Sequence, residues 1–121
     1  MDQDIHFQVP IAFAAGALTT YWQVPYRCTM RNLRGIVQAD PGDGETITVT
    51  YGTTAAGATT AIGVMTFGTT IAAGAVGTWV ADTTTGNTVM AADGFLKFVT
   101  STAATAVCDL DIELDPYART T

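Results

Sequence analysis

Residues 107–115 read Val107-Cys108-Asp109-Leu110-Asp111-Ile112-Glu113-Leu114-Asp115. From Cys108 onward, apolar side chains at even positions alternate with carboxylates at odd positions. A period of two is the pattern of a β-strand that buries one face and exposes the other. The stretch Thr46-Ile47-Thr48-Val49-Thr50-Tyr51 repeats this alternation, with threonines on the predicted outer face. Both stretches therefore predict strands that cover a core on one side only.

The rest of the chain also reads as strands separated by turns. Threonine and valine, which suit strands, are abundant, whereas good helix formers such as glutamate and lysine are scarce. The further predicted strands are Ile5–Ala14, Leu18–Val24, Thr29–Ala39, Ala61–Phe67, Gly77–Ala81, Thr88–Met90 and Phe95–Thr100, with loops in the Ala-rich segments Thr69–Gly77 and Thr102–Ala106. This spacing predicts an all-β fold: a single-domain, jelly-roll-like β-sandwich with antiparallel strands, occupying residues 15–121.

Residues 1–14 allow two interpretations. Pro10 interrupts the predicted first strand, and proline restricts a strand to the edge of a sheet. The segment is either an edge strand of the sandwich or an arm that leaves the body and contacts a partner. In the arm interpretation the contacting side chains are Ile5, Phe7 and Val9.

Composition excludes several functional classes. The chain has 121 residues, enough for one domain with a sizeable core, and a net charge of −6. Binding to nucleic acid or to an anionic membrane depends on Lys and Arg, so neither partner is expected. No apolar run approaches the ~20 residues of a transmembrane helix. Asp2 and Asp4 stand where a secretory signal would be basic, so we expect a chain made and kept in a cytoplasm.

Metal and cofactor binding have little support. Cys28 and Cys108 are expected to be buried, reduced and apolar in character, and the alternative is a disulfide across the sandwich, which needs an oxidising compartment. Two isolated cysteines and one histidine lack the spacing of a metal site. The loop Asp40–Glu45 carries Pro-Gly at its centre and is predicted to be a tight connection rather than a metal loop. We therefore expect no metal and no cofactor.

The carboxylates of residues 109–115 allow a functional and a structural interpretation. They form either a cation site or docking strip for a basic partner, or a solvated strand face that resists wrong pairing. In the second case Arg27, Arg31 and Arg34 would lie on a neighbouring strand and neutralise them.

Catalysis is not expected either. His6 is the one histidine, and Ser101, the one serine, lies outside any Gly-x-Ser-x-Gly motif. No phosphate-binding glycine loop is present. The sequence predicts a protein that is not an enzyme.

The surface is the remaining candidate for function. Charged residues make up only 13% of the chain, so much of the exterior must be Thr, Ala and Gly. Phe95, Lys97 and Val99 share one strand face, whereas Tyr21 and Trp22 point to opposite faces. Exposed apolar area of this extent is unusual for a monomer, so we expect a homo-oligomer, a trimer rather than a dimer. The candidate interface residues are Ile5, Phe7, Val9, Tyr21, Trp22, Tyr26, Phe95 and Val99.

Several stretches carry a resemblance to a known group of proteins. They are Gly16-Ala17-Leu18-Thr19-Thr20-Tyr21-Trp22-Gln23-Val24-Pro25-Tyr26, the segment Asp40–Val49, Gly86-Asn87-Thr88-Val89, Ala92-Asp93-Gly94 and the closing strand Ala106–Pro116. In style and composition the chain resembles the small β-sandwich head proteins of tailed bacteriophages, the capsid decoration or cement proteins. The resemblance brings no catalytic signature and no functional residue that carries over.

The resemblance implies a mechanical role. It implies a structural virion protein that binds the major capsid protein on the outer surface of an icosahedral shell and stabilises the expanded shell. Many modest contacts would act together, because a protein that binds only the expanded lattice stabilises that lattice. Two alternatives stay open: a head-fibre or tail-associated receptor- or glycan-binding module using Trp22, Tyr26 and Trp79, and a tail-tube-like polymer subunit.

Overall fold

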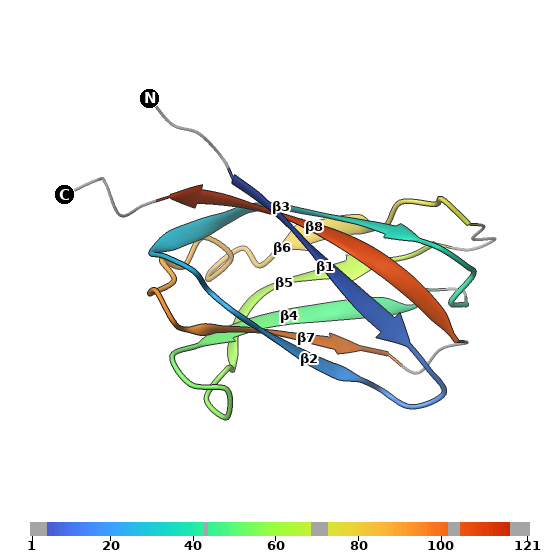
Figure 1. Cartoon of the computed structure of the whole chain (residues 1–121), viewed down its shortest axis with the longest axis horizontal. Coiled ribbons are helices and arrows are strands. Elements are labelled where there is room, and N and C mark those ends of the chain that lie inside the picture. The colour runs from blue at the N-terminus through green and yellow to red at the C-terminus, as the bar shows by residue number, and fades with distance from the viewer. Residues whose placement is uncertain (1–4, 43, 69–72, 102–104, 117–121) are drawn as a thin grey trace.

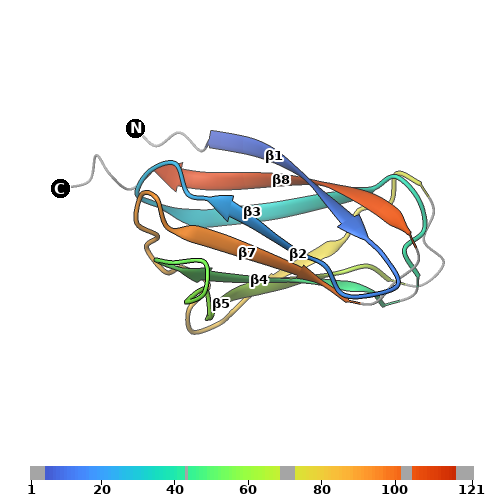
Figure 2. The same cartoon turned by 60° about the horizontal axis from the view of Figure 1, so that its bottom comes forward.

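Eight antiparallel strands form two sheets that pack face to face (Figures 1 and 2). The computed structural model describes residues 5–42, 44–68, 73–101 and 105–116. The strands are β1 (Ile5–Phe13), β2 (Thr19–Gln23), β3 (Cys28–Val37), β4 (Thr46–Gly52), β5 (Thr60–Thr66), β6 (Thr78–Ala81), β7 (Phe95–Thr100) and β8 (Ala106–Pro116). One sheet has the order β1-β8-β3, and the other has the order β2-β7-β4-β5-β6. The predicted all-β, single-domain sandwich is confirmed.

The strands pair in the nested order of a jelly roll. β1 pairs with β8, β2 with β7 and β4 with β5. The fourth pair of a jelly roll would join β3 and β6, and here β3 pairs with the segment that leads into β6 rather than with β6 itself. Residues just before β6 bond to β3, where the N–H of Val37 donates to the carbonyl of Ala75 and the N–H of Gly77 donates to that of Gly35. β6 itself then crosses to pair with β5. This segment therefore links the two sheets along one side of the sandwich.

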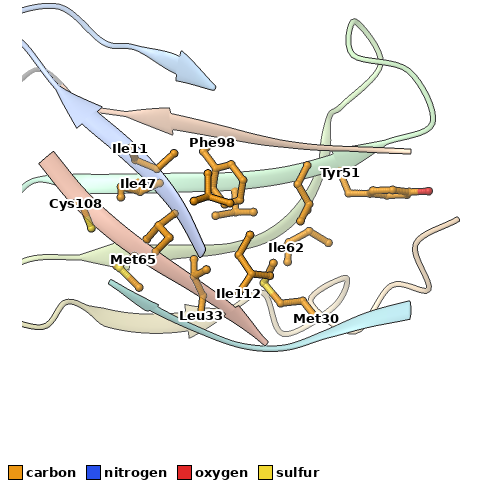
Figure 3. Close-up of a cluster of buried hydrophobic side chains, with 14 of the residues drawn as sticks. Ile11, Met30, Leu33, Ile47, Tyr51, Ile62, Met65, Phe98, Cys108 and Ile112 are labelled. Carbon is orange, nitrogen blue, oxygen red and sulfur yellow. The ribbon is translucent and has the colours of Figure 1, made fainter. Parts of the chain in front are cut away.

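The core lies between the two sheets and comes from both. Figure 3 shows Ile11, Leu33 and Ile112 meeting Ile47 and Phe98 across the interior. Each of these five side chains is almost fully buried. Burial of apolar area at this scale is the main stabilising contribution to such a domain.

The N-terminal segment is an edge strand where the structure describes it. β1 pairs with β8 over its whole length, and Ile11 and Phe13 are buried in the core. The arm interpretation is therefore wrong for residues 5–13, while residues 1–4 lie outside the described residues. The N–H of Gln38 donates to the carbonyl of Val107. The backbone N–H and C=O groups of the odd-numbered residues of β8 therefore point toward β3, and those of the even-numbered residues point toward β1. This alternation places the missing N–H of Pro10 on the free edge, where it costs no ladder bond.

One predicted strand is wrong. Residues 88–90 form no strand, and Met90 makes only an isolated bridge to Cys28, with N–H to carbonyl distances of 3.0 and 2.7 Å. A single bridge leaves no repeating ladder, and Gly86 and Asp93 keep the surrounding chain in turns. Of the predicted Ala-rich loops, residues 69–72 and 102–104 lie outside the described residues.

Candidate functional site: two contrasting outer faces

The outer face of the three-stranded sheet is acidic. Asp109, Asp111 and Asp115 point outward from β8, while Leu110 and Ile112 between them are buried in the core. The predicted alternation is thus confirmed. Because β8 is the central strand of its sheet, neighbours on both sides reach these carboxylates.

The acidic face is bonded within the sheet. His6 Nδ1 on β1 lies 2.9 Å from Asp111 Oδ2, and Gln38 Nε2 donates to Asp109 Oδ2 at 2.6 Å. On β3, Arg31 lies 3.7 Å from Asp115, and the backbone pairing places Arg34 opposite Asp111. Among the described residues no group of three His, Cys, Asp or Glu side chains comes together to hold a metal ion. This arrangement favours the interpretation as a solvated, neutralised strand face.

The outer face of the five-stranded sheet is almost uncharged. Its five strands carry one charged residue, Lys97. Tyr21 on β2 is 46% exposed and packs edge to face against Phe95 on β7, with ring centroids 6.5 Å apart and planes at 87°. Val64 and Val80, at the other end of the face, are also exposed. The face is therefore an open surface of threonine, valine and aromatic side chains.

The two ends of this face differ in shape. Tyr21 and Phe95 form an aromatic pair on β2 and β7, here called the ridge. Over β4, β5 and β6 the surface is hollowed into a groove of about 230 Å³, lined by Thr48, Val49, Ala61, Gly63, Val64, Val80, Ala81 and Asp82. The hollow has two causes: small side chains line it, and the pairing of β4 with β5 shifts between Val49 and Thr50.

Gly63 lies beneath the groove and makes room for a ring on the inner side of β5. A side chain at this position would place its Cβ 2.5 Å from the indole of Trp79, which packs against the core. The glycine thus lets Trp79 lie directly against the backbone of β5, where no larger residue fits.

A third group of candidates lies between the edges of the two sheets. Phe7 on β1 contacts Trp22 on β2, with ring centroids 5.3 Å apart, and Tyr26, at 6.3 Å. All three rings are partly buried against the core. The Tyr26 hydroxyl is buried without a hydrogen-bond partner in the described part of the chain, and burial raises the pKa of this phenol, with Cys28 contributing. Since Trp22, Tyr26 and Trp79 all pack on the core, they do not form a flat, open platform of the kind that binds glycans.

The structure divides the predicted interface residues into three groups. Tyr21, Phe95 and Val99 lie on the outer face of the five-stranded sheet, as their spacing predicts. Ile5, Phe7, Trp22 and Tyr26 lie along the side where β1 and β2 have free edges. Val9 is only 7% exposed and belongs to the core, so its predicted place in an interface is wrong.

Sequence reasoning missed Val80 and Asp82. Among the described residues Val80 is the most exposed large apolar side chain, at 61%, and Asp82 lines the groove. The available signal was weak, because β6 has only four residues and its alternation is short.

The two cysteines are free and buried. Cys28 lies opposite Pro116, whereas Cys108 lies opposite Val37, nine residues further along β3. At ~3.3 Å per residue the two thiols are about 30 Å apart, far beyond the reach of a disulfide. Burial, together with Asp115, raises the pKa of Cys28 to about 11. Burial, with a smaller contribution from Asp109, raises the pKa of Cys108 to about 12.

The residues considered for catalysis have structural partners. His6 is exposed and bonded to Asp111. Ser101 donates to Glu45 Oε1 at 2.5 Å and accepts the N–H of Thr46 at 2.8 Å, which joins the ends of β7 and β4. These two side chains lie in separate parts of the sandwich, on different sheets. In the loop Asp40–Glu45, the Asp40 carboxylate accepts the N–H of Gly42 at 2.8 Å, a bond of turn type.

Within the described ranges no helix is long and apolar enough to cross a membrane. Comparison of the chain with protein-family models, with curated proteins and with solved structures finds no match.

Proposed function

We propose that this chain is a structural, non-catalytic subunit of a virion. In this role it binds the major capsid protein on the outer surface of an icosahedral phage capsid and stabilises the expanded shell. The observation that supports an assembly role is the outer face of the five-stranded sheet, which exposes Tyr21, Val64 and Val80 and whose strands carry one charged residue, Lys97. Exposed apolar side chains gathered on one nearly uncharged sheet face favour an interaction site.

The sequence resemblance supplies the identity of the assembly, and the fold is compatible with it. The carboxylates of Asp109, Asp111 and Asp115 are bonded within one sheet, so the sandwich presents one acidic face and one face with almost no charge. The proposal needs no cofactor, nucleic acid or membrane. Its location is the capsid exterior, after assembly in the host cytoplasm.

We place the contact with the capsid on the side where β1 and β2 have free edges. Alternate N–H and C=O groups of β1 point away from β8 there and can accept a further strand. Ile5, which is 39% exposed, lies at the start of this edge, two residues before Phe7. Edge addition gives a docking mode that requires little change in the sandwich.

Co-sedimentation tests the proposal. The purified chain is mixed with expanded and with unexpanded shells of the major capsid protein encoded in the same genome. We expect it to sediment with expanded shells and to raise their melting temperature. Ile5→Asp should weaken this binding, whereas Val107→Asp, at a valine of similar exposure (42%) on the acidic sheet, should not. Failure to bind either shell would refute the proposed function.

A further inference from the structure

The ridge and the groove lie on opposite halves of the same face. The sheet order β2-β7-β4-β5-β6 puts β4 at its centre, with the ridge on β2 and β7 and the groove over β4, β5 and β6. A two-fold axis along β4, in the plane of the face, places β2 of one copy over β6 of the other and β7 over β5. It therefore sets the strands of each ridge over strands that form the other copy's groove, the self-complementary arrangement of a two-fold interface.

The two features also match in position along the strands. The backbone pairing places Tyr21 opposite Lys97, Lys97 opposite Thr50 and Thr50 opposite Ala61. Tyr21 thus stands at the level of Ala61, which lines the groove. A rotation about an axis parallel to the strands leaves this level unchanged, so the ring of Tyr21 meets the groove of a second copy.

The charges of the face match under the same operation. Lys97 is the one charge on the strands of the face and has no ion-pair partner among the described residues. Asp82 lines the groove, and its N–H donates to the carbonyl of Ile62 at 2.9 Å, which holds it beside β5. Because β7 of one copy faces β5 of the other, each Lys97 ammonium approaches the partner's groove at the end where the carboxylate lies.

The Asp82 carboxylate is held in its charged form. The backbone N–H groups of Thr85 and Thr84 both donate to its Oδ1 at 2.9 Å, and these bonds lower the pKa of Asp82. The carboxylate therefore remains ionised and available to a cation over the whole neutral range.

Overall charge favours this face over the others. Each copy carries a net charge of −6, so two copies repel each other wherever their carboxylates approach. Face-to-face packing of the five-stranded sheets leaves both acidic faces on the outside of the pair, with both sandwiches between them.

We propose that the outer face of the five-stranded sheet is the site of a two-fold homodimer, in which Tyr21 of each copy packs in the other's groove and Lys97 faces Asp82. This names the partner of the face from which the assembly role above was argued, and it is tested without any capsid. Five strands ~4.8 Å apart and about six residues long give a face of about 24 by 20 Å. That area lies at the lower end for specific interfaces, so the dimer forms and dissociates with concentration.

Sedimentation equilibrium over a dilution series tests the dimer. We expect a mass approaching twice 12.6 kDa at high concentration and falling to 12.6 kDa on dilution. Val80→Asp on the face should abolish dimerisation, whereas Val107→Asp, a matched exposed valine on the acidic face, should leave it intact. Both valines are exposed, so at dilutions where the wild-type chain is a monomer both variants should keep its circular dichroism and melting temperature. A monomer at every concentration, a trimer, or equal loss in both variants would overturn the proposal.

Cross-linking tests the direction of the axis. Thr19 on β2 and Val80 on β6 are both exposed. They stand at the same position along the strands, because the backbone pairing runs across the sheet from Thr19 to Val99, Thr48, Val64 and Val80. Thr19→Cys and Val80→Cys chains are mixed and treated with a thiol cross-linker that spans the ~10 Å between packed sheets. We expect the mixture to form linked pairs and each variant alone to form few. Preferential linking of Thr19→Cys to itself would mean that the axis runs across the strands, which contradicts the proposal. The wild-type chain, whose cysteines are buried, is the control.

Discussion

The two outer faces of the sandwich are built on the same backbone pattern but satisfy their side chains differently. On the three-stranded sheet, β8 presents Asp109 and Asp111, and Gln38 and His6 of the same chain bind them. On the five-stranded sheet, Val64 and Val80 have no such partners and stand in solvent. On the first face the carboxylates of Asp109 and Asp111 have partners within the chain, although Val107 is exposed beside them, whereas the second face exposes apolar side chains with almost no charge among them. This difference is the basis for our proposal that a second copy of the chain covers the five-stranded sheet.

We expect the free energy of unfolding to depend on the side chains buried between the two sheets rather than on those of either outer face. Leu110→Ala, on the inner side of β8, should lower the free energy of unfolding by about 2–5 kcal/mol, because it leaves a cavity in the core. Asp109→Asn, its outward neighbour, should change it by less than about 0.5 kcal/mol. Urea denaturation of both variants measures the contrast. Equal losses would show that the acidic face is structural.

The interior beneath the acidic face should be sensitive to alkali. Cys28 and Cys108 have a pKa of about 11 and about 12 when folded, against 9.0 for an ordinary thiol, chiefly because they are buried. Above pH 9 the unfolded chain loses these protons first, so stability falls as pH rises toward 11. The slope approaches about 1.4 kcal/mol per pH unit for each thiol. Denaturant titrations at several pH values measure it. Cys108→Ala should start less stable but show a flatter decline, and an unchanged slope would contradict this explanation.

Beneath the groove, Trp79 packs directly against Gly63 on the inner side of β5. Gly63→Ala should cost about 1–3 kcal/mol, because its Cβ would lie 2.5 Å from the Trp79 indole and force that ring to move. Gly68 is the matched control, since a Cβ there meets nothing within 4 Å, and Gly68→Ala should be neutral or slightly stabilising. Thermal melts compare the two. A tolerated Gly63→Ala would show that Trp79 has room to shift.

The smallest effect is expected at the exposed ion pair of the acidic face. Asp111→Asn removes the contact with His6 but also reduces the repulsion between neighbouring carboxylates. Exposed pairs contribute little, so the free energy of unfolding at pH 7 should change by less than about 0.5 kcal/mol. His6→Gln, measured in parallel, should behave alike. A loss above about 1.5 kcal/mol would mean that this face holds the sheet together.

The all-β sandwich and the outward carboxylates of the acidic face could be predicted from the sequence. In β8 and β4 a strict period of two decides which side chains turn inward, and it correctly predicts that Asp109, Asp111 and Thr48 face outward. The opposite orientations of Tyr21 and Trp22 follow from the same rule, and their contacts confirm them. Such features are local, so a single strand contains all the information they need.

The features that could not be predicted depend on how strands are paired. The groove forms where β4, β5 and β6 lie side by side around a shift in pairing after Val49. No stretch of sequence shows that Asp82 and Thr48 line the same hollow. The pairing of β1 with β8, which decides between an arm and an edge strand, also joins residues about a hundred positions apart.

Amide chemical shifts in a dilution series test the contrast between the faces most directly, because they report on both faces of one molecule. We expect concentration-dependent shifts at Tyr21, Val64 and Val80 on the five-stranded sheet. We expect constant shifts at Gln8 and Asp111 on the acidic face, which stays in solvent in monomer and dimer. Shifts confined to the acidic face, or no dependence on concentration at either face, would contradict the assignment of the five-stranded sheet as the surface that a partner covers.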